Sequence, residues 1–331
     1  MTGSAARIVS TRPLPPAARE ILDSAGEVIA PDGIEPLTTG QLRELVGGAD
    51  AIVSQLYDVI DGEVMDIAGD QLRIVANVAA GYNNLDVAAA RERRIVITNT
   101  PGVLTDATAD VTLGLILMVT RRLGEGERLL RRGDSWSWDL EFMLGTSLAG
   151  RTLGIVGFGQ IGRAVAQRAQ AFGMRVLHAS ARPGAALRHN PEASSVEVTT
   201  FDELLATSDI VSLHCPLTPD THHLMDAARL AQMRPDAYLI NTARGPVIDE
   251  AALLAALRAG HLAGAGLDVF EHEPEVSAGL LDLENVVAIP HLGSATREVR
   301  NSMAELAASN VAAVLRGGTP PTPVWLPEQG T

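Results

Sequence analysis

Three side chains that could together hold an anion and move a proton stand in the second half of the sequence: Arg244, Glu273 and His291. A guanidinium pairs with a carboxylate through two parallel hydrogen bonds, so Arg244 is suited to orient a carboxylate substrate. His291 can exchange a proton with a substrate oxygen, and Glu273 can hydrogen-bond the imidazole, keeping it protonated and oriented. Taken alone, Arg244 could be a surface cation, Glu273 could cap a loop, and His291 could be a structural histidine. Together, they favour acid–base chemistry on an anionic substrate.

The element that could position a cofactor beside them is a glycine-rich turn. The apolar run Leu153–Val156 leads into Gly157-Phe158-Gly159-Gln160-Ile161-Gly162, and a helix-forming segment follows. In this pattern the first glycine permits a tight turn, the second lets backbone approach a pyrophosphate, and the third lets the helix pack closely on the strand. A strand, turn and helix in this order predict a dinucleotide site, with Gln160 and Ile161 at the helix start.

Short apolar runs that alternate with helical segments predict two parallel α/β sheets. Ligands bind at the carboxyl ends of parallel strands, so the segments carrying Arg244, Glu273 and His291 are expected at one edge of the second sheet. The runs before the glycine-rich turn are Arg7–Val9, Glu27–Ile29, Ala51–Val53, Leu72–Val75 and Ile95–Ile97; those after it are Arg175–His178, Val196–Val198, Ile210–Leu213, Ala237–Ile240, Gly264–Asp268 and Val286–Ile289.

The predicted domain organisation is discontinuous. The apolar segment Val103–Leu123 is expected to form one buried helix at a domain crossing. After residue 292 the chain is long enough for one more helix, with Ser294 as its expected N-cap, but not for a third domain. This helix should therefore return to the first domain. We therefore predict a substrate domain of residues 1–102 and 293–331, into which a dinucleotide-binding domain of residues 103–292 is inserted. Thr200 and Glu203 are expected to form a capping box.

Composition limits the class of partner. The 331 residues carry a formal net charge of −14, which argues against nucleic acid binding. A single cysteine, Cys215, excludes an internal disulfide and suits the cytoplasm. No secretion signal opens the chain, and the longest apolar stretch is too short to span a membrane. Adjacent His222 and His223 have poor ligand spacing and are expected in a solvated turn, so no metal is predicted.

In combination and order, these motifs resemble the D-isomer-specific 2-hydroxyacid dehydrogenase family. The resemblance implies two Rossmann-like domains, a homodimer formed through the nucleotide-binding domain, and Arg244, Glu273 and His291 as catalytic residues. It places Asp268 near the nicotinamide carboxamide, and Ala80 and Gly81 as backbone donors to the substrate carboxylate. Leu56 and Trp138 are further expected substrate contacts. The remaining expected cofactor contacts are Thr108, Cys215, Pro216, Thr242, Ala243 and Gly293.

Within the family, the sequence is similar to glyoxylate/hydroxypyruvate reductases in Thr105–Asp110 and in Trp138. Trp138 would then reach the neighbouring subunit's active site, while local packing beside Trp136 is an equal alternative. Where an acidic residue would bind the ribose of NAD, the sequence has Ser180, with Arg182 two residues on. These side chains favour NADPH, although Ala181 stands where an arginine would strengthen the preference.

The sequence therefore predicts reduction of a small 2-keto acid, glyoxylate or hydroxypyruvate, to the D-2-hydroxy acid. One alternative is another NAD(P)-dependent oxidoreductase of this fold that acts on a bulkier 2-keto acid, phosphoglycerate or phosphite. The other is a nucleotide-sensing binding protein without catalysis, which would keep the same three residues.

Overall fold

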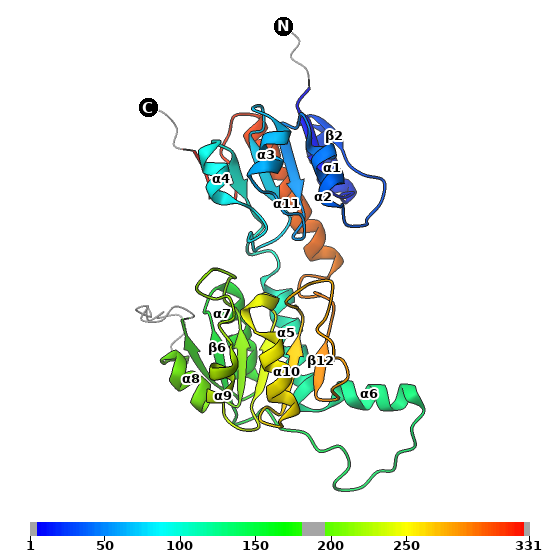
Figure 1. Cartoon of the computed structure of the whole chain (residues 1–331), viewed down its shortest axis with the longest axis vertical. Helices are drawn as coiled ribbons and strands as arrows, with labels where there is room; N and C mark the ends of the chain where they lie inside the picture. Colours follow the sequence, from blue (N-terminus) through cyan, green and yellow to red (C-terminus); the bar gives the residue numbers. More distant parts are fainter. Residues whose placement is uncertain (1–4, 181–195, 328–331) are drawn as a thin grey trace. The chain divides into compact units, whose positions relative to one another are not determined.

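The computed structural model describes residues 5–180 and 196–327, which divide into two compact units. Unit 1 comprises Met1–Leu104 and Thr296–Thr331, and unit 2 comprises Thr105–Ala295. The chain thus leaves unit 1, forms unit 2 and returns (Figure 1). The division falls next to the boundaries expected after residues 102 and 292. The predicted fold class, two α/β units of which the second is inserted in the first, is confirmed.

Unit 1 is built on a six-stranded sheet in the order β13-β5-β4-β3-β1-β2, with all pairings parallel except that of β13 with β5. Its strands are β1 (Arg7–Ser10), β2 (Glu27–Ile29), β3 (Ala51–Ser54), β4 (Ile74–Asn77), β5 (Val96–Thr98) and β13 (Pro323–Trp325). Its helices are α1 (Pro16–Asp23), α2 (Thr39–Val46), α3 (Gly62–Ala68), α4 (Val87–Glu92) and α11 (Arg297–Leu315). The α11 helix contacts α1, β3 and β4, which ties the returning chain to the first hundred residues.

Unit 2 is built on a seven-stranded parallel sheet in the order β12-β11-β10-β9-β6-β7-β8. Its strands are β6 (Thr152–Val156), β7 (Arg175–Ala179), β8 (Glu197–Val198), β9 (Ile210–Leu213), β10 (Tyr238–Asn241), β11 (Gly264–Leu267) and β12 (Val286–Ala288). Its helices are α5 (Thr105–Thr120), α6 (Leu123–Arg132), α7 (Gln160–Ala171), α8 (Phe201–Thr207), α9 (Ala227–Gln232) and α10 (Glu250–Arg258). The strand order reverses at β6, between β9 and β7, and this is where such sheets bind dinucleotides.

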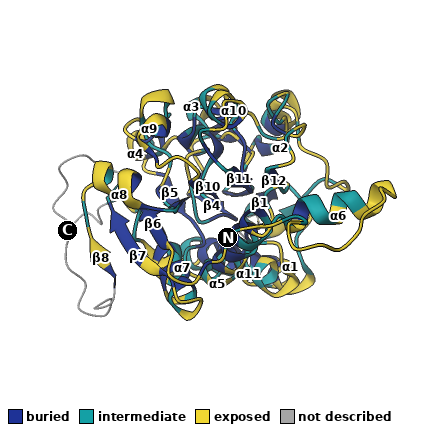
Figure 2. Cartoon of the chain, turned by 90° about the horizontal axis from the view of Figure 1, so that it is seen from below, coloured by how far each residue is buried: buried dark blue, intermediate teal, exposed yellow. Residues whose placement is uncertain are grey.

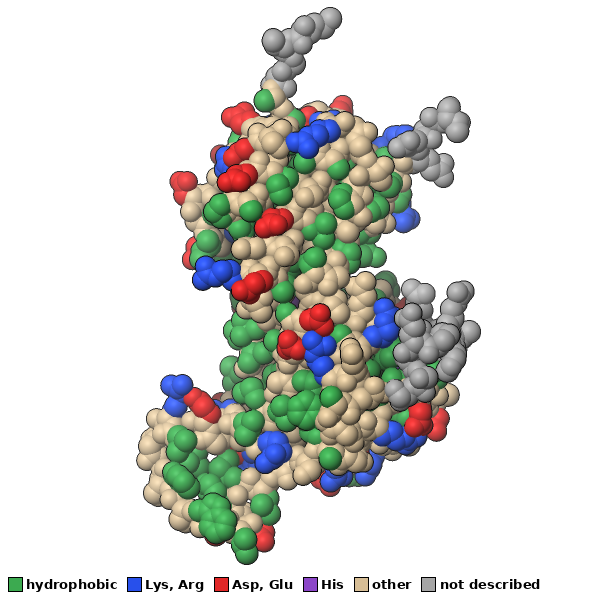
Figure 3. All heavy atoms as spheres, turned by 180° about the vertical axis from the view of Figure 1, so that it is seen from behind, with side chains coloured by type: hydrophobic (Ala, Val, Ile, Leu, Met, Phe, Trp, Pro, Cys, Tyr) green, Lys and Arg blue, Asp and Glu red, His purple; other side chains and the backbone are tan. Residues whose placement is uncertain are grey.

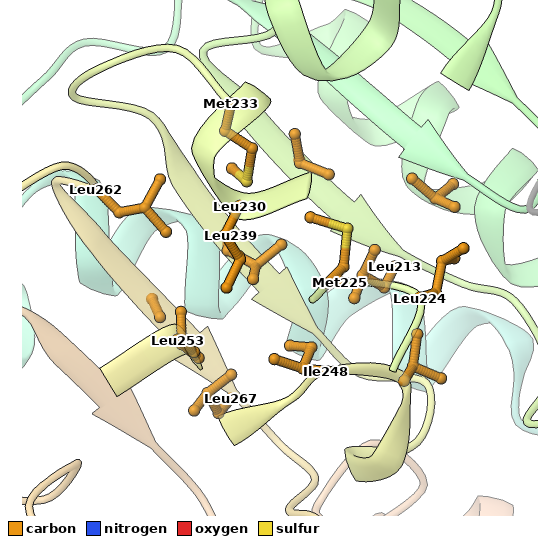
Figure 4. Close-up of a cluster of buried hydrophobic side chains, with 14 of the residues drawn as sticks. Leu213, Leu224, Met225, Leu230, Met233, Leu239, Ile248, Leu253, Leu262 and Leu267 are labelled. Carbon is orange, nitrogen blue, oxygen red and sulfur yellow. The ribbon is translucent and has the colours of Figure 1, made fainter. Parts of the chain in front are cut away.

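The inner strands of unit 2 are buried on both faces, as Figure 2 shows for β6. On one face, Leu213, Leu239 and Leu267 from three adjacent strands pack against Leu230 and Leu253 from α9 and α10 (Figure 4). Each such leucine contributes about 1.5–3 kcal/mol by leaving water. This packed sheet is the rigid base from which the loops at its carboxyl edge project.

Two details of the predicted helix ends are wrong. Thr296, not Ser294, caps α11, because its hydroxyl accepts a hydrogen bond from the backbone N–H of Val299. Thr200 does cap α8 by accepting from the N–H of Glu203, but the Glu203 carboxylate accepts from the hydroxyl of Thr199. Only half of the expected capping box is therefore present.

The helix expected over Val103–Leu123 is present, and a second helix that the sequence did not predict follows it. The first, α5, ends at Thr120, and Arg122 has a left-handed backbone (φ 53°) that turns the chain into α6. The α6 helix and the segment after it, residues 123–144, extend away from the sheet and are called the arm below (Figure 1). Hydrophobic side chains gather on this arm (Figure 3), where Leu130, Trp138 and Leu140 are 61, 77 and 79% exposed. Among the described residues, no helix is long and apolar enough to cross a membrane.

Candidate active site

Three loops at one edge of the unit 2 sheet carry the residues expected to do chemistry. Arg244 follows β10, Glu273 follows β11 and His291 follows β12. These strands are consecutive neighbours in the sheet and run parallel, so their carboxyl ends lie side by side. The fold therefore brings the three loops together, as the sequence pattern predicts.

His291 and Glu273 form a hydrogen-bonded pair. The distance from His291 Nδ1 to Glu273 Oε2 is 2.8 Å, and the two side chains are 19 and 13% exposed. The other carboxylate oxygen, Oε1, accepts a hydrogen bond of 2.9 Å from the backbone N–H of Phe270. The carboxylate is thus held by its own loop, and it fixes the orientation of the imidazole. Nε2, the other ring nitrogen, is the atom that could exchange a proton with a substrate.

Asp268 shapes the turn that presents His291. His291 has a left-handed backbone (φ 52°), which is uncommon for a residue other than glycine. Its N–H donates to the Asp268 carbonyl at 2.8 Å, and the two Asp268 carboxylate oxygens accept from the N–H groups of Leu292 and Gly293. Burial raises the pKa of Asp268, opposed by the hydrogen bond from Leu292 and the charge of His291. The sequence alone did not predict that Asp268 would hold the turn of His291.

The Arg244 loop is packed directly on the Glu273 loop. A Cβ built on Gly245 would lie 1.8 Å from the carbonyl oxygen of Phe270, so only glycine fits. Asn241 closes the Arg244 loop from inside: its Nδ2 donates to the Arg244 carbonyl at 2.9 Å, and its Oδ1 accepts from the N–H of Ala243 at 3.0 Å. The arginine is therefore carried by a backbone with little freedom to shift.

The glycine-rich turn fits a dinucleotide. Gly157 has φ 92°, and a Cβ there would lie 2.8 Å from the N of Cys215; a Cβ on Gly162 would lie 2.4 Å from the Gly157 carbonyl oxygen. A Cβ on Gly159 would meet nothing within 4 Å, so this side of the turn is open. Gly159 is the N-cap of α7, and no described side chain caps this helix. Gln160 and Ile161 follow it in the first turn. Uncapped N–H groups at a helix start are a ready anion site.

A chain of buried hydroxyls links three further expected cofactor residues through α5. Thr108 Oγ1 donates to the Gly293 carbonyl at 3.2 Å, Thr112 Oγ1 donates to the Thr108 carbonyl at 2.8 Å, and Thr112 Oγ1 lies 2.9 Å from Thr242 Oγ1. Thr112 was not predicted. The hydroxyls join the loops after β10 and β12, so the side chains of Thr108 and Thr242 are held by the protein itself. Ala243 is half-buried beside Thr242.

The loop after β9 lies against the glycine-rich turn and carries Cys215 and Pro216. Cys215 is buried, which raises the pKa of its thiol to about 11, whereas Pro216 is exposed. His214, which sequence reasoning missed, has Nε2 2.8 Å from Ser212 Oγ. Burial lowers the pKa of His214 to about 4, so its imidazole is neutral at physiological pH.

The residues expected to choose between NAD and NADP follow β7. Ser180 is half-buried directly after this strand, and Arg182 lies outside the described residues. His178, at the end of the same strand, stacks on Phe158 of the glycine-rich turn with ring centroids 4.2 Å apart. Burial lowers the pKa of His178. Among the described residues at this strand end, none is a carboxylate at the position typical of NAD-binding proteins, where Ser180 stands instead.

Four expected substrate residues lie elsewhere. Leu56, Ala80 and Gly81 are half-buried in unit 1, in loops after β3 and β4. The loop after β4 is held by amides that the sequence did not single out: Asn77 Nδ2 donates to the Gly81 carbonyl at 3.0 Å and to Asn84 Oδ1 at 3.0 Å. In unit 2, Trp138 projects from the arm and is 77% exposed, whereas Trp136 stacks on Phe142 with ring centroids 5.9 Å apart.

The adjacent histidines do not both lie in a solvated turn as expected. His222 is exposed, but His223 Nε2 lies 2.6 Å from Glu271 Oε1, with the two side chains 35 and 16% exposed. That prediction was wrong for His223, because its partner is 48 residues away and only the fold brings them together. Among the described residues, no cluster of three or more His, Cys, Asp or Glu side chains could hold a metal ion.

Known proteins are similar to this chain over most of its length. Residues 113–293 match the family model for the NAD-binding domain of D-isomer-specific 2-hydroxyacid dehydrogenases. A glyoxylate reductase of Thermococcus litoralis is 47% identical over 290 residues, which cover 85% of each chain. The chain belongs to the D-isomer-specific 2-hydroxyacid dehydrogenase family.

Solved structures agree with this assignment. The TT0316 protein from Thermus thermophilus superposes with a TM-score of 0.89 at 46% identity, covering 96% of this chain and all of that one. An NADPH-dependent glyoxylate/hydroxypyruvate reductase from Sinorhizobium meliloti, solved with NADP and malonate, has a TM-score of 0.83 at 34% identity, covering 99 and 100% of the two chains. The protein is therefore an NAD(P)-dependent D-2-hydroxyacid dehydrogenase, and unit 2 is its nicotinamide cofactor domain.

Proposed function

We propose that this dehydrogenase reduces glyoxylate or hydroxypyruvate to the D-2-hydroxy acid with NADPH. The single observation that carries the proposal is the hydrogen-bonded His291–Glu273 pair, which lies at the same carboxyl edge of the sheet as the glycine-rich turn. Relatives named glyoxylate reductase support the substrate class. No observation favours phosphoglycerate, phosphite or a bulkier keto acid, and a purely sensing protein is not what the family membership indicates.

The bound cofactor supplies the hydride. In the proposed mechanism His291 Nε2 donates a proton to the substrate carbonyl oxygen, which becomes the hydroxyl of the product. Glu273 holds the imidazolium through Nδ1 and stabilises its charge. Arg244 binds the substrate carboxylate and so fixes which face of the carbonyl is exposed to reduction. In the reverse direction the same imidazole acts as the base.

For the cofactor we propose a preference for NADP over NAD. Ser180 follows β7 where an acidic side chain would repel a 2′-phosphate, and the S. meliloti relative was solved with NADP. The pyrophosphate would lie on the open side of Gly159 at the start of α7. In this proposal Asp268 lies near the nicotinamide carboxamide, Thr242, Cys215 and Pro216 are further cofactor contacts, and Arg182 would add charge at the phosphate.

Comparison of kcat/KM with NADPH and NADH tests the cofactor proposal. We expect NADPH to be favoured about 10-fold or more, since one charge-assisted contact contributes about 1.5–3 kcal/mol. Ser180→Asp should reverse the order, because it places a carboxylate against the 2′-phosphate. Equal values for the two cofactors, or an advantage for NADH in the unchanged protein, would contradict the preference.

We also propose that unit 1 is the substrate domain and that the protein is a homodimer formed through unit 2. Backbone N–H groups of Ala80 and Gly81, with Leu56 nearby, would receive the substrate carboxylate, and Trp138 would act at the partner's site. The exposed apolar arm supports a protein contact there, because isolated large apolar surfaces are rarely left to water. Light scattering on Leu140→Glu and the unchanged protein should show monomer and dimer, respectively; a monomeric unchanged protein would refute the dimer.

A further inference from the structure

The loop that carries Glu273 also takes part in a second histidine–carboxylate pair. Glu271 Oε1 is 2.6 Å from His223 Nε2, just as Glu273 Oε2 is 2.8 Å from His291 Nδ1. The two carboxylates are two residues apart, and each is bonded to a histidine from a different loop. The loop that carries Glu273 is therefore anchored twice, and the His223 anchor has no place in the proposed proton transfer.

His223 is also bonded to the segment that follows Arg244. Its backbone N–H donates to the Pro246 carbonyl at 2.8 Å, and the N–H of Met225 donates to the Val247 carbonyl at 3.0 Å. Pro246 is two residues after Arg244 in the chain. His223 thus touches the Arg244 segment through its backbone and the Glu273 loop through its side chain.

The far side of Glu271 is fixed as well. Its Oε2 accepts from the N–H of Glu250 at the start of α10 at 3.2 Å, and its own N–H donates to Glu250 Oε1 at 2.6 Å. Glu250 is only 4% exposed and accepts a further hydrogen bond from the Ser277 hydroxyl. The Glu271 carboxylate therefore lies between His223 and the N-terminus of α10, where a negative charge is favoured.

We infer that His223 is a positioning residue, a clamp that holds the loop of Glu273 in register with the segment of Arg244. This inference rests on the proposed roles of those two residues. When His223 is bonded to Glu271, the carboxylate of Glu273 stays within reach of His291 Nδ1. Without that bond, the Glu273 loop keeps its contact with α10 and the packing of Phe270 on Gly245, but loses its hydrogen bond to His223, which is itself bonded to the segment after Arg244. A shift of a few tenths of an ångström at Glu273 then lowers the rate of proton transfer.

Two substitutions at this position separate the bond from the backbone. His223 has φ 50°, which asparagine tolerates, so His223→Asn keeps the turn but is too short to reach Glu271. His223→Gln extends an amide N–H to about the reach of Nε2 and restores the bond. His222→Ala is the matched control, because that ring is exposed and stacks on His223 with centroids 4.1 Å apart, whereas the bond to Glu271 belongs to His223.

For His223→Asn we expect kcat to fall about 10-fold, because small displacements of catalytic groups are costly. KM for the keto acid and Kd for the cofactor should stay within about two-fold, since neither ligand touches His223 in the proposed mechanism. His223→Gln should recover kcat to within about three-fold of the unchanged protein. His222→Ala should leave kcat unchanged. If His223→Asn does not fold, Glu271→Gln tests the same bond while keeping an oxygen for the N–H of α10.

The decisive experiment combines His223→Asn with Glu273→Gln. Because His223 acts through Glu273, its substitution should change kcat by less than about two-fold in the Glu273→Gln background. A full 10-fold loss in both backgrounds, or no loss of kcat in His223→Asn alone, overturns the clamp. If instead Glu273→Gln alone leaves kcat unchanged, it is the proposed role of Glu273 that fails. The two failures are thus distinguishable.

Discussion

Different chemistry fixes the loop after β4 in unit 1 and the loops after β11 and β12 in unit 2. In unit 1, the loop after β4 is held by neutral amides: Asn77 and Asn84 bond each other, and Asn84 Nδ2 also donates to the carbonyls of Gln55 and Asp58 at 3.1 and 2.9 Å. In unit 2, the loops after β11 and β12 are held by the charged or titratable groups Asp268, Glu271 and Glu273.

This difference follows from what each loop has to present. An amide network fixes backbone without adding charge, which suits the proposed role of the loop after β4, whose N–H groups would receive a carboxylate. A buried carboxylate fixes a loop and also changes the proton affinity of its neighbours. In the proposed function, the same parallel α/β architecture would serve binding in one unit and proton transfer in the other, according to the polar groups at its strand ends.

The largest effect should come from His291→Ala. General acid catalysis contributes about 10²–10⁴-fold, so we expect kcat to fall about 10³-fold. The Kd for NADPH, measured by titration calorimetry, should change by less than about three-fold. A kcat within 10-fold of the unchanged protein would mean that unit 2 does not supply the proton from this residue.

Arg244→Lys should come next. Lysine keeps the charge but loses the two-pronged geometry, so we expect KM for the keto acid to rise about 30–100-fold with a smaller change in kcat. Steady-state kinetics over a range of glyoxylate concentrations measures this. An unchanged KM would contradict the carboxylate-binding role, and a mere fall in kcat would move Arg244 to the chemical step.

In unit 1, Asn84→Ala should weaken substrate binding without affecting chemistry. It removes the donor to two carbonyls and the acceptor of Asn77, which frees the loop of Ala80 and Gly81. We expect KM to rise about 10-fold with kcat within about two-fold, as for the loss of one or two buried hydrogen bonds. A fall in kcat with an unchanged KM would contradict the proposed division of roles between the two units.

The prediction with the smallest expected effect on activity concerns the pH dependence of stability. The pKa of His214 is lowered to about 4 in the fold, against about 6.5 in an unfolded chain, so the unfolded state takes up the proton first as pH falls. Between pH 6.5 and 4 this should cost unit 2 about 2 kcal/mol of unfolding free energy, allowing for partial exposure of the ring. His214→Gln, which can keep the bond to Ser212, should remove that loss. Hydrogen exchange of the β9 amides measures it; identical pH dependence in both proteins would contradict it.

The sequence predicted the parts of the site that depend on local pattern. The glycine-rich turn, the strands and the order of Arg244, Glu273 and His291 follow from periodicity and from the rule that ligands bind at carboxyl strand ends. The pairing of His291 with Glu273 was predicted because the two residue types serve one reaction. The catalytic roles of Arg244, Glu273 and His291 remain predictions, which the experiments above test.

What the sequence did not predict depends on contacts between distant segments. Glu271 looks like any loop carboxylate until the fold places His223 beside it, and Asn77 and Asn84 look like turn residues. The α6 helix over Leu123–Arg132 was not predicted, and the left-handed Arg122 that separates it from α5 leaves no mark in the apolar pattern. The cap at Thr296 competes with an equally plausible serine two residues earlier.

The central claim is tested most directly by turnover of the unchanged protein with NADPH and a panel of small 2-keto acids, with chiral analysis of the product. We predict saturable NADPH oxidation with glyoxylate or hydroxypyruvate, and D-glycerate as the product from hydroxypyruvate. Binding of NADPH without oxidation by any member of the panel, or an L-product, would contradict the account.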